Sequence, residues 1–365
     1  MNERNIFDTL QEEIMQSDLP EEEICLRLSV LLKAGSQKIN LMLVGATGCG
    51  KSSTVNALFD MDAATVGIGV DPETKDIVRY ELGNLIIWDT PGLGDTVEND
   101  KAHIEQIVRK LSETNDDGSL LIDLVLIVLD ASSKDLAVSY DVINNTLIPC
   151  LGKDNAHRIP IALNQSDMAM KGRNWNPVAN EPNDILMDFL EKKSASVKRR
   201  VFEATGITVE PVCYCAGYTD EDGERCDPYN LSKLLFCIMM AIPAEKRLIL
   251  VDKLNAAEDN WTSSDGYMDY PEAINRGFFS SLLSGIGTGA EKGFVIGGCV
   301  IGVPGMVVGG LIGAIAGGLC SLAAKPFKFL SKLKSRKEFV DGQDEDYRND
   351  TNGVGCVDCG GEMDC

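Results

Sequence analysis

A glycine-rich run near the start of the chain has the residue types and spacing of a phosphate cradle. It follows an apolar stretch and opens a helical pattern. Glycines let the backbone turn so that successive N–H groups point at phosphate oxygens, and the start of a helix adds positive potential. Lys51 would reach the β- and γ-phosphates, and the Ser52 hydroxyl would ligate Mg²⁺. The predicted phosphate-binding residues are Gly45, Ala46, Thr47, Gly48, Cys49, Gly50, Lys51, Ser52 and Ser53.

Two further segments carry groups that fit Mg²⁺ and a terminal phosphate. Asp89 begins the sequence Asp-Thr-Pro-Gly at the end of a strand-like run, which places a carboxylate near the metal and the Gly92 amide near the γ-phosphate. Thr74 lies in an irregular stretch upstream, where it could close over both. Thr65 is its rival, and a turn or strand start is the simpler interpretation of Thr74. We predict Ser52, Thr74 and Asp89 as metal ligands and Lys51, Thr74 and Gly92 as the catalytic groups.

Residues 164–167, Asn-Gln-Ser-Asp, carry groups that distinguish guanine from adenine. The Asp167 carboxylate can accept hydrogen bonds from guanine N1–H and the 2-amino group, whereas adenine presents an acceptor there and would be repelled. A backbone N–H after the last strand could reach guanine O6, although that match is weaker. The predicted base-binding residues are Asn164, Gln165, Asp167, Cys215 and Ala216.

These motifs lie between alternating strand-like and helix-like segments. Apolar runs predict six strands, at 39–44, 76–82, 85–88, 121–129, 159–163 and 207–214. Helical spacing and length predict helices at 51–59, 100–111, 135–148 and 184–204. The alternation predicts an α/β fold with a doubly wound, mostly parallel six-stranded sheet.

The motif set resembles that of translation-factor-class P-loop GTPases, near the Era-like group. The segments VGIGVDPETKD, WDTPGLGD, LIVLDASSKDL and NQSDMAMKGR are similar to those of the YeeP/YkfA prophage-type GTPases. The resemblance covers roughly residues 38–240. It implies a Ras-like fold and GTP hydrolysis, with functional positions at Gly45, Lys51, Ser52, Asp89, Gly92, Asn164 and Asp167.

Two residues depart from that family pattern. Gln165 replaces the usual lysine, which puts packing over the base in doubt. Leu93 stands where Ras has a glutamine that orients the attacking water. We therefore hypothesise slow intrinsic turnover that needs a partner or self-association.

Composition limits the other function classes. A net charge of -22 argues against a general nucleic-acid binder, and no DNA partner is expected. The 12 cysteines lie mostly in apolar runs behind a start without a secretory signal, so we interpret them as thiols in reducing cytosol. Two histidines leave little material for a catalytic triad or a histidine metal site.

The flanks of the predicted G domain, residues 37–242, differ in character. Residues 1–36 alternate acidic clusters with apolar positions and predict amphipathic helices. A helical linker is expected at 243–278, and an acidic, disordered tail at 339–365, where Cys356, Cys359 and Cys365 lack a fourth ligand for a closed zinc site.

Residues 279–338 predict a glycine-rich helical hairpin with a basic flank. Within them, 293–324 is a run of 32 residues without a charge. Glycines recur every fourth residue, which allows close helix approach. A re-entrant membrane hairpin with both ends cytosolic fits the basic flank, and a soluble hairpin buried against this domain or another subunit is the alternative.

The sequence thus predicts a Mg²⁺-dependent GTPase, cytoplasmic or at the cytoplasmic membrane face, whose nucleotide state controls a membrane- or oligomer-associating module. A septin-like assembly protein that binds GTP without hydrolysing it is the alternative. An ATPase is a third option.

Overall fold

The structure, a computed structural model, describes residues 6–59, 61, 65–66, 77–94, 96–134, 136–219 and 225–274. All of them lie in the first of the two units into which the chain divides, Met1–Ile312. The predicted metal ligand Thr74, the glycine-rich hairpin and the acidic tail lie outside the described residues.

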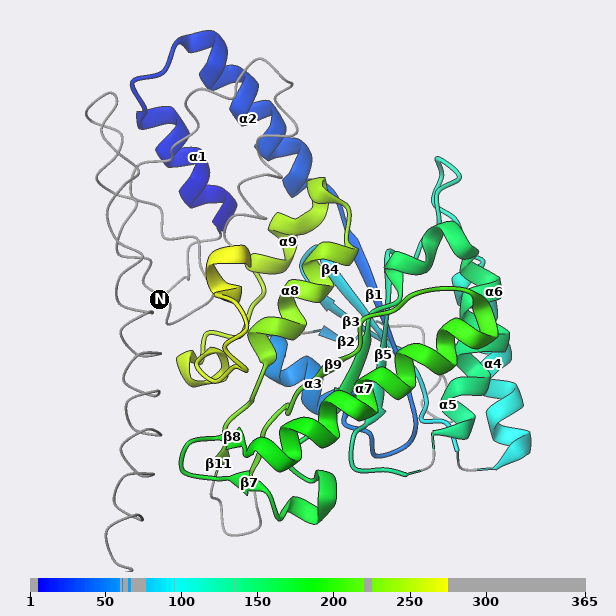
Figure 1. The fold of residues 1–365 in the computed structure, drawn as a ribbon. Helices are drawn as coiled ribbons and strands as arrows, with labels where there is room; N and C mark the ends of the chain where they lie inside the picture. The colour runs from blue at the N-terminus through cyan, green and yellow to red at the C-terminus, as the bar shows by residue number, and fades with distance from the viewer. Residues whose placement is uncertain are drawn as a thin grey trace, which may run out of the picture. The chain divides into compact units, whose positions relative to one another are not determined.

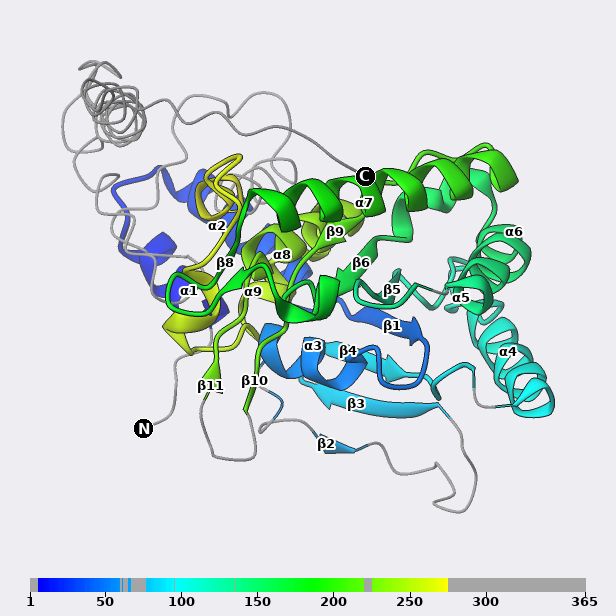
Figure 2. The ribbon, with the colours of Figure 1, turned by 60° about the horizontal axis from the view of Figure 1, so that its bottom comes forward.

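A seven-stranded sheet forms the centre of the described residues. Its order is β2-β3-β4-β1-β5-β6-β9, and β4, β1, β5, β6 and β9 run parallel, whereas β2 and β3 are antiparallel to their neighbours. The strands are β1 (Ile39–Gly45), β2 (Thr65–Val66), β3 (Val78–Leu82), β4 (Leu85–Asp89), β5 (Leu124–Asp130), β6 (Ile161–Asn164) and β9 (Val212–Cys213). The predicted mostly parallel, doubly wound sheet is confirmed, with the short β2 added at its edge (Figure 2).

Helices lie on both faces of this sheet (Figure 1). One apolar core joins the sheet to α3, α8 and α9, and a second joins its other face to α4, α5, α6 and α7. Every residue of β1 is buried, because the strand is parallel to both neighbours and covered on both faces, and Asn40 is its one polar side chain. The helices are α3 (Lys51–Leu58), α4 (Val97–Leu111), α5 (Ala137–Val142), α6 (Ile148–Leu151), α7 (Asp184–Thr205), α8 (Leu231–Ala241) and α9 (Arg247–Val251).

The helix predicted at 135–148 is interrupted in the structure. A π-helical turn, Ile143–Leu147, separates α5 from α6. Pro149 lies at the start of α6, and it has no N–H to donate to the preceding turn. The regular hydrogen-bond ladder therefore shifts at this point, which apolar spacing alone does not reveal.

Short elements connect the larger ones. Two small hairpins pair β7 (Trp175–Asn176) with β8 (Glu181–Pro182), and β10 (Tyr218–Thr219) with β11 (Arg225–Cys226). Short 3₁₀ turns lie at Lys153–Arg158, Ala244–Lys246 and Glu258–Trp261, and a turn at Ala169–Gly172 has left-handed backbone at Met170 and Lys171.

Two helices precede the sheet. α1 (Ile6–Gln16) and α2 (Glu21–Gly35) pack against α9 through a small core of Leu10, Ile14, Leu31 and Leu248. Of the helices that the structure describes, none combines the length and apolar character needed to cross a membrane.

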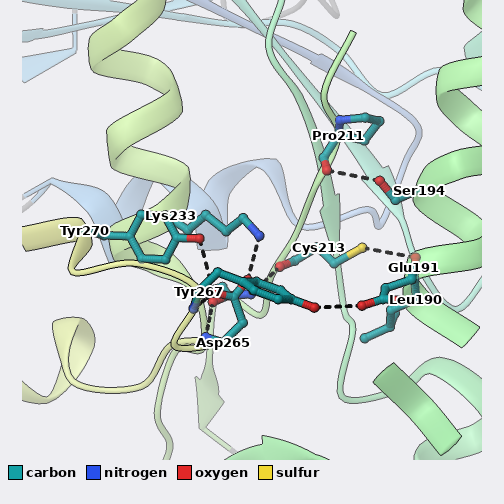
Figure 3. A network of polar contacts seen from close by, with 10 residues as sticks. Leu190, Glu191, Ser194, Pro211, Cys213, Lys233, Asp265, Tyr267 and Tyr270 are labelled. Atoms are coloured by element: carbon teal, nitrogen blue, oxygen red, sulfur yellow. Dashed lines mark hydrogen bonds and ion pairs between the residues drawn. The ribbon is translucent and has the colours of Figure 1, made fainter. Parts of the chain in front are cut away.

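The segment that follows α9 is bound to the sheet and its helices. Trp261 is buried in the core, and its backbone carbonyl accepts a hydrogen bond of 3.0 Å from Ser232 Oγ. The side chain of Asp265 contacts Lys233 on α8, and Tyr267 reaches Glu191 on α7 (Figure 3). Residues 255–270 are therefore held against α7 and α8.

Candidate nucleotide-binding site

The phosphate loop joins β1 to α3. Gly50 has a φ of 89°, the left-handed region that favours glycine, and a side chain there would overlap the Asn164 amide. Helix α3 begins at the next residue, Lys51, so the first N–H groups of the helix point into the loop. The loop has the backbone form and the helix N-terminus that an anion site requires.

Lys51 folds back over this loop. Its Nζ donates hydrogen bonds to the carbonyl oxygens of Gly45, at 3.0 Å, and Ala46, at 3.2 Å. These bonds hold the ammonium group beside the first residues of the loop. Burial raises the pKa of the Asp89 carboxyl, and the nearby Lys51 charge partly opposes that rise.

Asp89 and Ser52 line one cavity of about 340 Å³, together with Asn56 and Tyr80. Asp89 Oδ1 is buried and has no hydrogen-bond partner among the described residues. Burial raises the pKa of Asp89, since the carboxylate loses solvation. An unpartnered buried carboxylate oxygen beside a hydroxyl is a donor set that a hard cation such as Mg²⁺ prefers, so these residues fit the predicted metal.

Asn164, the first residue of the predicted base-binding turn, joins that turn to the phosphate loop. It is 3% exposed, its Nδ2 donates to the Cys49 carbonyl at 3.0 Å, and its Oδ1 accepts from the Ala216 N–H at 3.0 Å. Gln165 adds a second link, because its Nε2 donates to the Gly48 carbonyl at 2.9 Å. The structure therefore brings the predicted phosphate and base residues together.

Asp167 follows on the same turn and is 7% exposed. Its Oδ1 has no hydrogen-bond partner among the described residues. The Cys215 thiol lies near this carboxylate, and burial together with the Asp167 charge raises the pKa of Cys215, so the thiol stays protonated. Asp167 thus presents an acceptor at the end of the site where the sequence predicts the base.

The residues after Asp89 lie against the phosphate loop. Gly92 is so close to Thr47 that a side chain at Gly92 would overlap it. Leu93 pairs with the loop, as its N–H donates to Gly45 and its carbonyl accepts from Thr47 N–H at 3.0 Å. The Leu93 side chain is 2% exposed and belongs to the core beside α4. Leu93 therefore faces the protein interior.

Two polar residues at this site escaped the sequence reasoning. The Thr54 and Tyr214 hydroxyls are 2.5 Å apart in the buried interior behind the phosphate loop. They are 160 positions apart in the chain, and neither belongs to a nucleotide-binding motif. No local pattern could have paired them. Thr74 cannot be placed relative to the site, because it lies outside the described residues, whereas the backbone of its rival Thr65 lies in β2.

Part of this site lies in a segment that matches a known protein family. Residues 40–165 match the family model described as "50S ribosome-binding GTPase". The match contains the whole phosphate loop, the Asp89 segment and the first two residues of the predicted base-binding turn.

Two curated proteins are similar over short regions. Cell division control protein 10 of Saccharomyces cerevisiae is 40% identical over 100 residues, covering 23% of this chain and 30% of that protein. Interferon-gamma-inducible GTPase 10 of Mus musculus is 29% identical over 99 residues, covering 26% and 24%. The similarity thus spans less than a third of either relative. A crystal structure of Toc33 from Arabidopsis thaliana with Mg²⁺ and GMPPNP has a TM-score of 0.36 and 16% identity, covering 67% of this chain and 98% of that one.

Proposed function

We propose that this chain, which carries a G domain of the P-loop GTPase class, binds GTP and hydrolyses it to GDP and phosphate with Mg²⁺. The observation that best supports guanine binding is the environment of Asp167. This buried carboxylate has an oxygen without a described partner, and Asn164 in the same turn is hydrogen-bonded to the phosphate loop. Guanine presents donors, N1–H and the 2-amino group, to such an acceptor, whereas adenine presents an acceptor at the same place.

Each part of the site has a role in this proposal. The backbone N–H groups of 45–53 and the Lys51 ammonium bind the β- and γ-phosphates. Ser52 and Asp89 hold Mg²⁺, with Thr74 as the expected third ligand, and the Gly92 N–H contacts the γ-phosphate. The metal neutralises charge on the phosphate oxygens.

The proposed turnover is slow without a partner or self-association. The Leu93 side chain is buried in the core. It therefore cannot orient the attacking water as the glutamine at this position does in Ras. The same observation favours the alternative, a septin-like assembly protein that retains GTP. Measurement of phosphate release separates the two.

The test uses the purified full chain. We expect labelled GDP to bind, unlabelled GTP to displace it, and ATP at the same concentration to leave it in place. Phosphate release should require Mg²⁺ and stop with a chelator, and Lys51→Ala should abolish both binding and release. Tightly retained guanine nucleotide with no release would overturn the enzyme proposal, and displacement by ATP would overturn guanine selectivity.

We further propose that nucleotide state controls the glycine-rich segment 279–338, and that the chain groups with the Era-like, YeeP/YkfA type. The motifs and the uncharged run support these finer assignments. Fractionation with vesicles of anionic lipid compares the full chain with a chain that ends after residue 278, beyond the buried Ile274. A full chain that stays monomeric and unbound with both GDP and a non-hydrolysable GTP analogue would refute control of such a module.

A further inference from the structure

A chain of buried hydroxyl groups reaches the phosphate loop from behind. Thr54 Oγ1 lies 2.7 Å from the Gly50 carbonyl oxygen, which can only accept, so Thr54 donates its proton there. The Tyr214 hydroxyl lies 2.5 Å from the same Thr54 oxygen and must therefore be the donor of that bond. The order is Tyr214 to Thr54 to Gly50.

The last carbonyl of this chain sets the direction of a phosphate-facing amide. The peptide unit between Gly50 and Lys51 is planar and trans, so its C=O and N–H point in opposite directions. Thr54 holds the Gly50 oxygen with its hydroxyl and with its N–H at 2.9 Å. The Lys51 N–H consequently points away from the core, into the loop.

The same tyrosine holds the base-binding turn through its backbone. Its N–H donates to the Leu163 carbonyl at 2.9 Å, and its carbonyl accepts from the Ser166 N–H at 3.2 Å. Tyr214 and Thr54 are both 0% exposed, so water does not compete for these bonds. Tyr214 therefore contacts both halves of the site from the interior, in addition to the bridge that Asn164 and Gln165 form.

We propose that the Tyr214 hydroxyl is a positioning group that holds the phosphate loop in register with the base-binding turn, and so determines affinity for the β-phosphate. The inference rests on the proposed function, binding of a guanine nucleotide at this site. The hydroxyl touches no nucleotide and acts through Thr54 and Gly50. Its loss loosens the Gly50–Lys51 peptide while the Asp167 carboxylate stays in place.

The experiment compares GDP with GMP on the full chain, by competition against a fluorescent GDP analogue. Tyr214→Phe should weaken GDP binding about tenfold, the scale of one buried hydrogen bond, and leave GMP within about twofold. Thr54→Val should reproduce this loss of GDP affinity, whereas Thr54→Ser, which keeps the hydroxyl, should bind GDP like the parent. The Tyr214→Phe/Thr54→Val double variant should bind GDP about as weakly as Thr54→Val, since both changes break the same chain.

Tyr140→Phe is the matched control, because it removes the hydroxyl of a half-buried tyrosine on α5 and should bind both nucleotides like the parent. Equal losses for GDP and GMP, no loss for either, or additive losses in the double variant would overturn the inference while leaving the proposed function intact. A parent chain that binds no GDP overturns both. If Tyr214→Phe does not fold, the Thr54 pair decides alone.

Discussion

Asp89 and Asp167 share a state that proteins usually avoid. Asp167 is buried and Asp89 is half-buried, and each has a buried carboxylate oxygen without a partner among the described residues. The sequence predicted both, because each follows a buried strand at a fixed distance from a glycine or asparagine. It could not predict Tyr214, whose contribution depends on a contact with a residue 160 positions away.

Replacement of Asp167 by asparagine tests base recognition directly. The amide keeps the size of the side chain but loses one acceptor and gains a donor, so GTP binding should weaken about a hundredfold or more. Xanthosine triphosphate, which has a carbonyl in place of the 2-amino group, should bind better than it does to the parent. Competition against labelled GDP measures both, and unchanged preference for GTP would contradict the assignment of Asp167.

Leu93→Gln separates a buried residue from a catalytic one. The side chain is 2% exposed, so an amide there should lower the free energy of unfolding by about 2 to 3 kcal/mol, and phosphate release should not accelerate. Urea unfolding and single-turnover hydrolysis are the measurements, with Leu93→Met as the volume-matched control. Faster hydrolysis in Leu93→Gln would show that residue 93 reaches the nucleotide.

At the scale of elements, the apolar runs predicted which segments form strands, but they predicted the first and last residue of each strand less well. The run at 207–214 yields only two strand residues, Val212–Cys213, because Pro211 has no N–H for the ladder and the chain then turns into the base-binding loop. Residues 65–66 carry no strand signal of their own and pair because β3 lies beside them. Strand identity was predictable, but edge pairing and helix interruptions depend on tertiary neighbours.

The packing of α1 and α2 on α9 gives a prediction at this scale. Leu10 is fully buried between these helices, so Leu10→Ala should lower the free energy of unfolding by about 3 kcal/mol. Met15, on the same helix, is 54% exposed, and Met15→Ala should change the free energy of unfolding by less than about 0.5 kcal/mol. Thermal and urea unfolding with GDP present check this, and equal effects of the two changes would mean that α1 does not pack on the domain.

At the scale of the whole described chain, the segment before the glycine-rich run is joined to the nucleotide site. Asn230 donates to the Cys213 carbonyl, one residue before Tyr214, and accepts from the Asp265 N–H at 2.7 Å. Asp265 also contacts Lys233 at 2.5 Å and accepts from the Tyr270 hydroxyl (Figure 3). Strain at residues 255–274 would therefore reach β9 directly.

Asp265→Ala tests this attachment. The Asp265 side chain is 3% exposed, and its removal leaves the partly exposed Lys233 ammonium, the Tyr270 hydroxyl and the Asn230 amide each with one hydrogen-bond partner fewer. The free energy of unfolding should therefore fall by about 2 to 3 kcal/mol. Protease cleavage within residues 255–274 should then become faster in the variant. GDP should slow this cleavage, because a ligand that holds the predicted base-binding loop also stabilises β9 and Asn230. Glu191→Gln is the control, since its bond to Tyr267 is exposed and worth little. Cleavage at the parent rate, with or without GDP, would mean that this segment is held independently of Asp265 and of the nucleotide site.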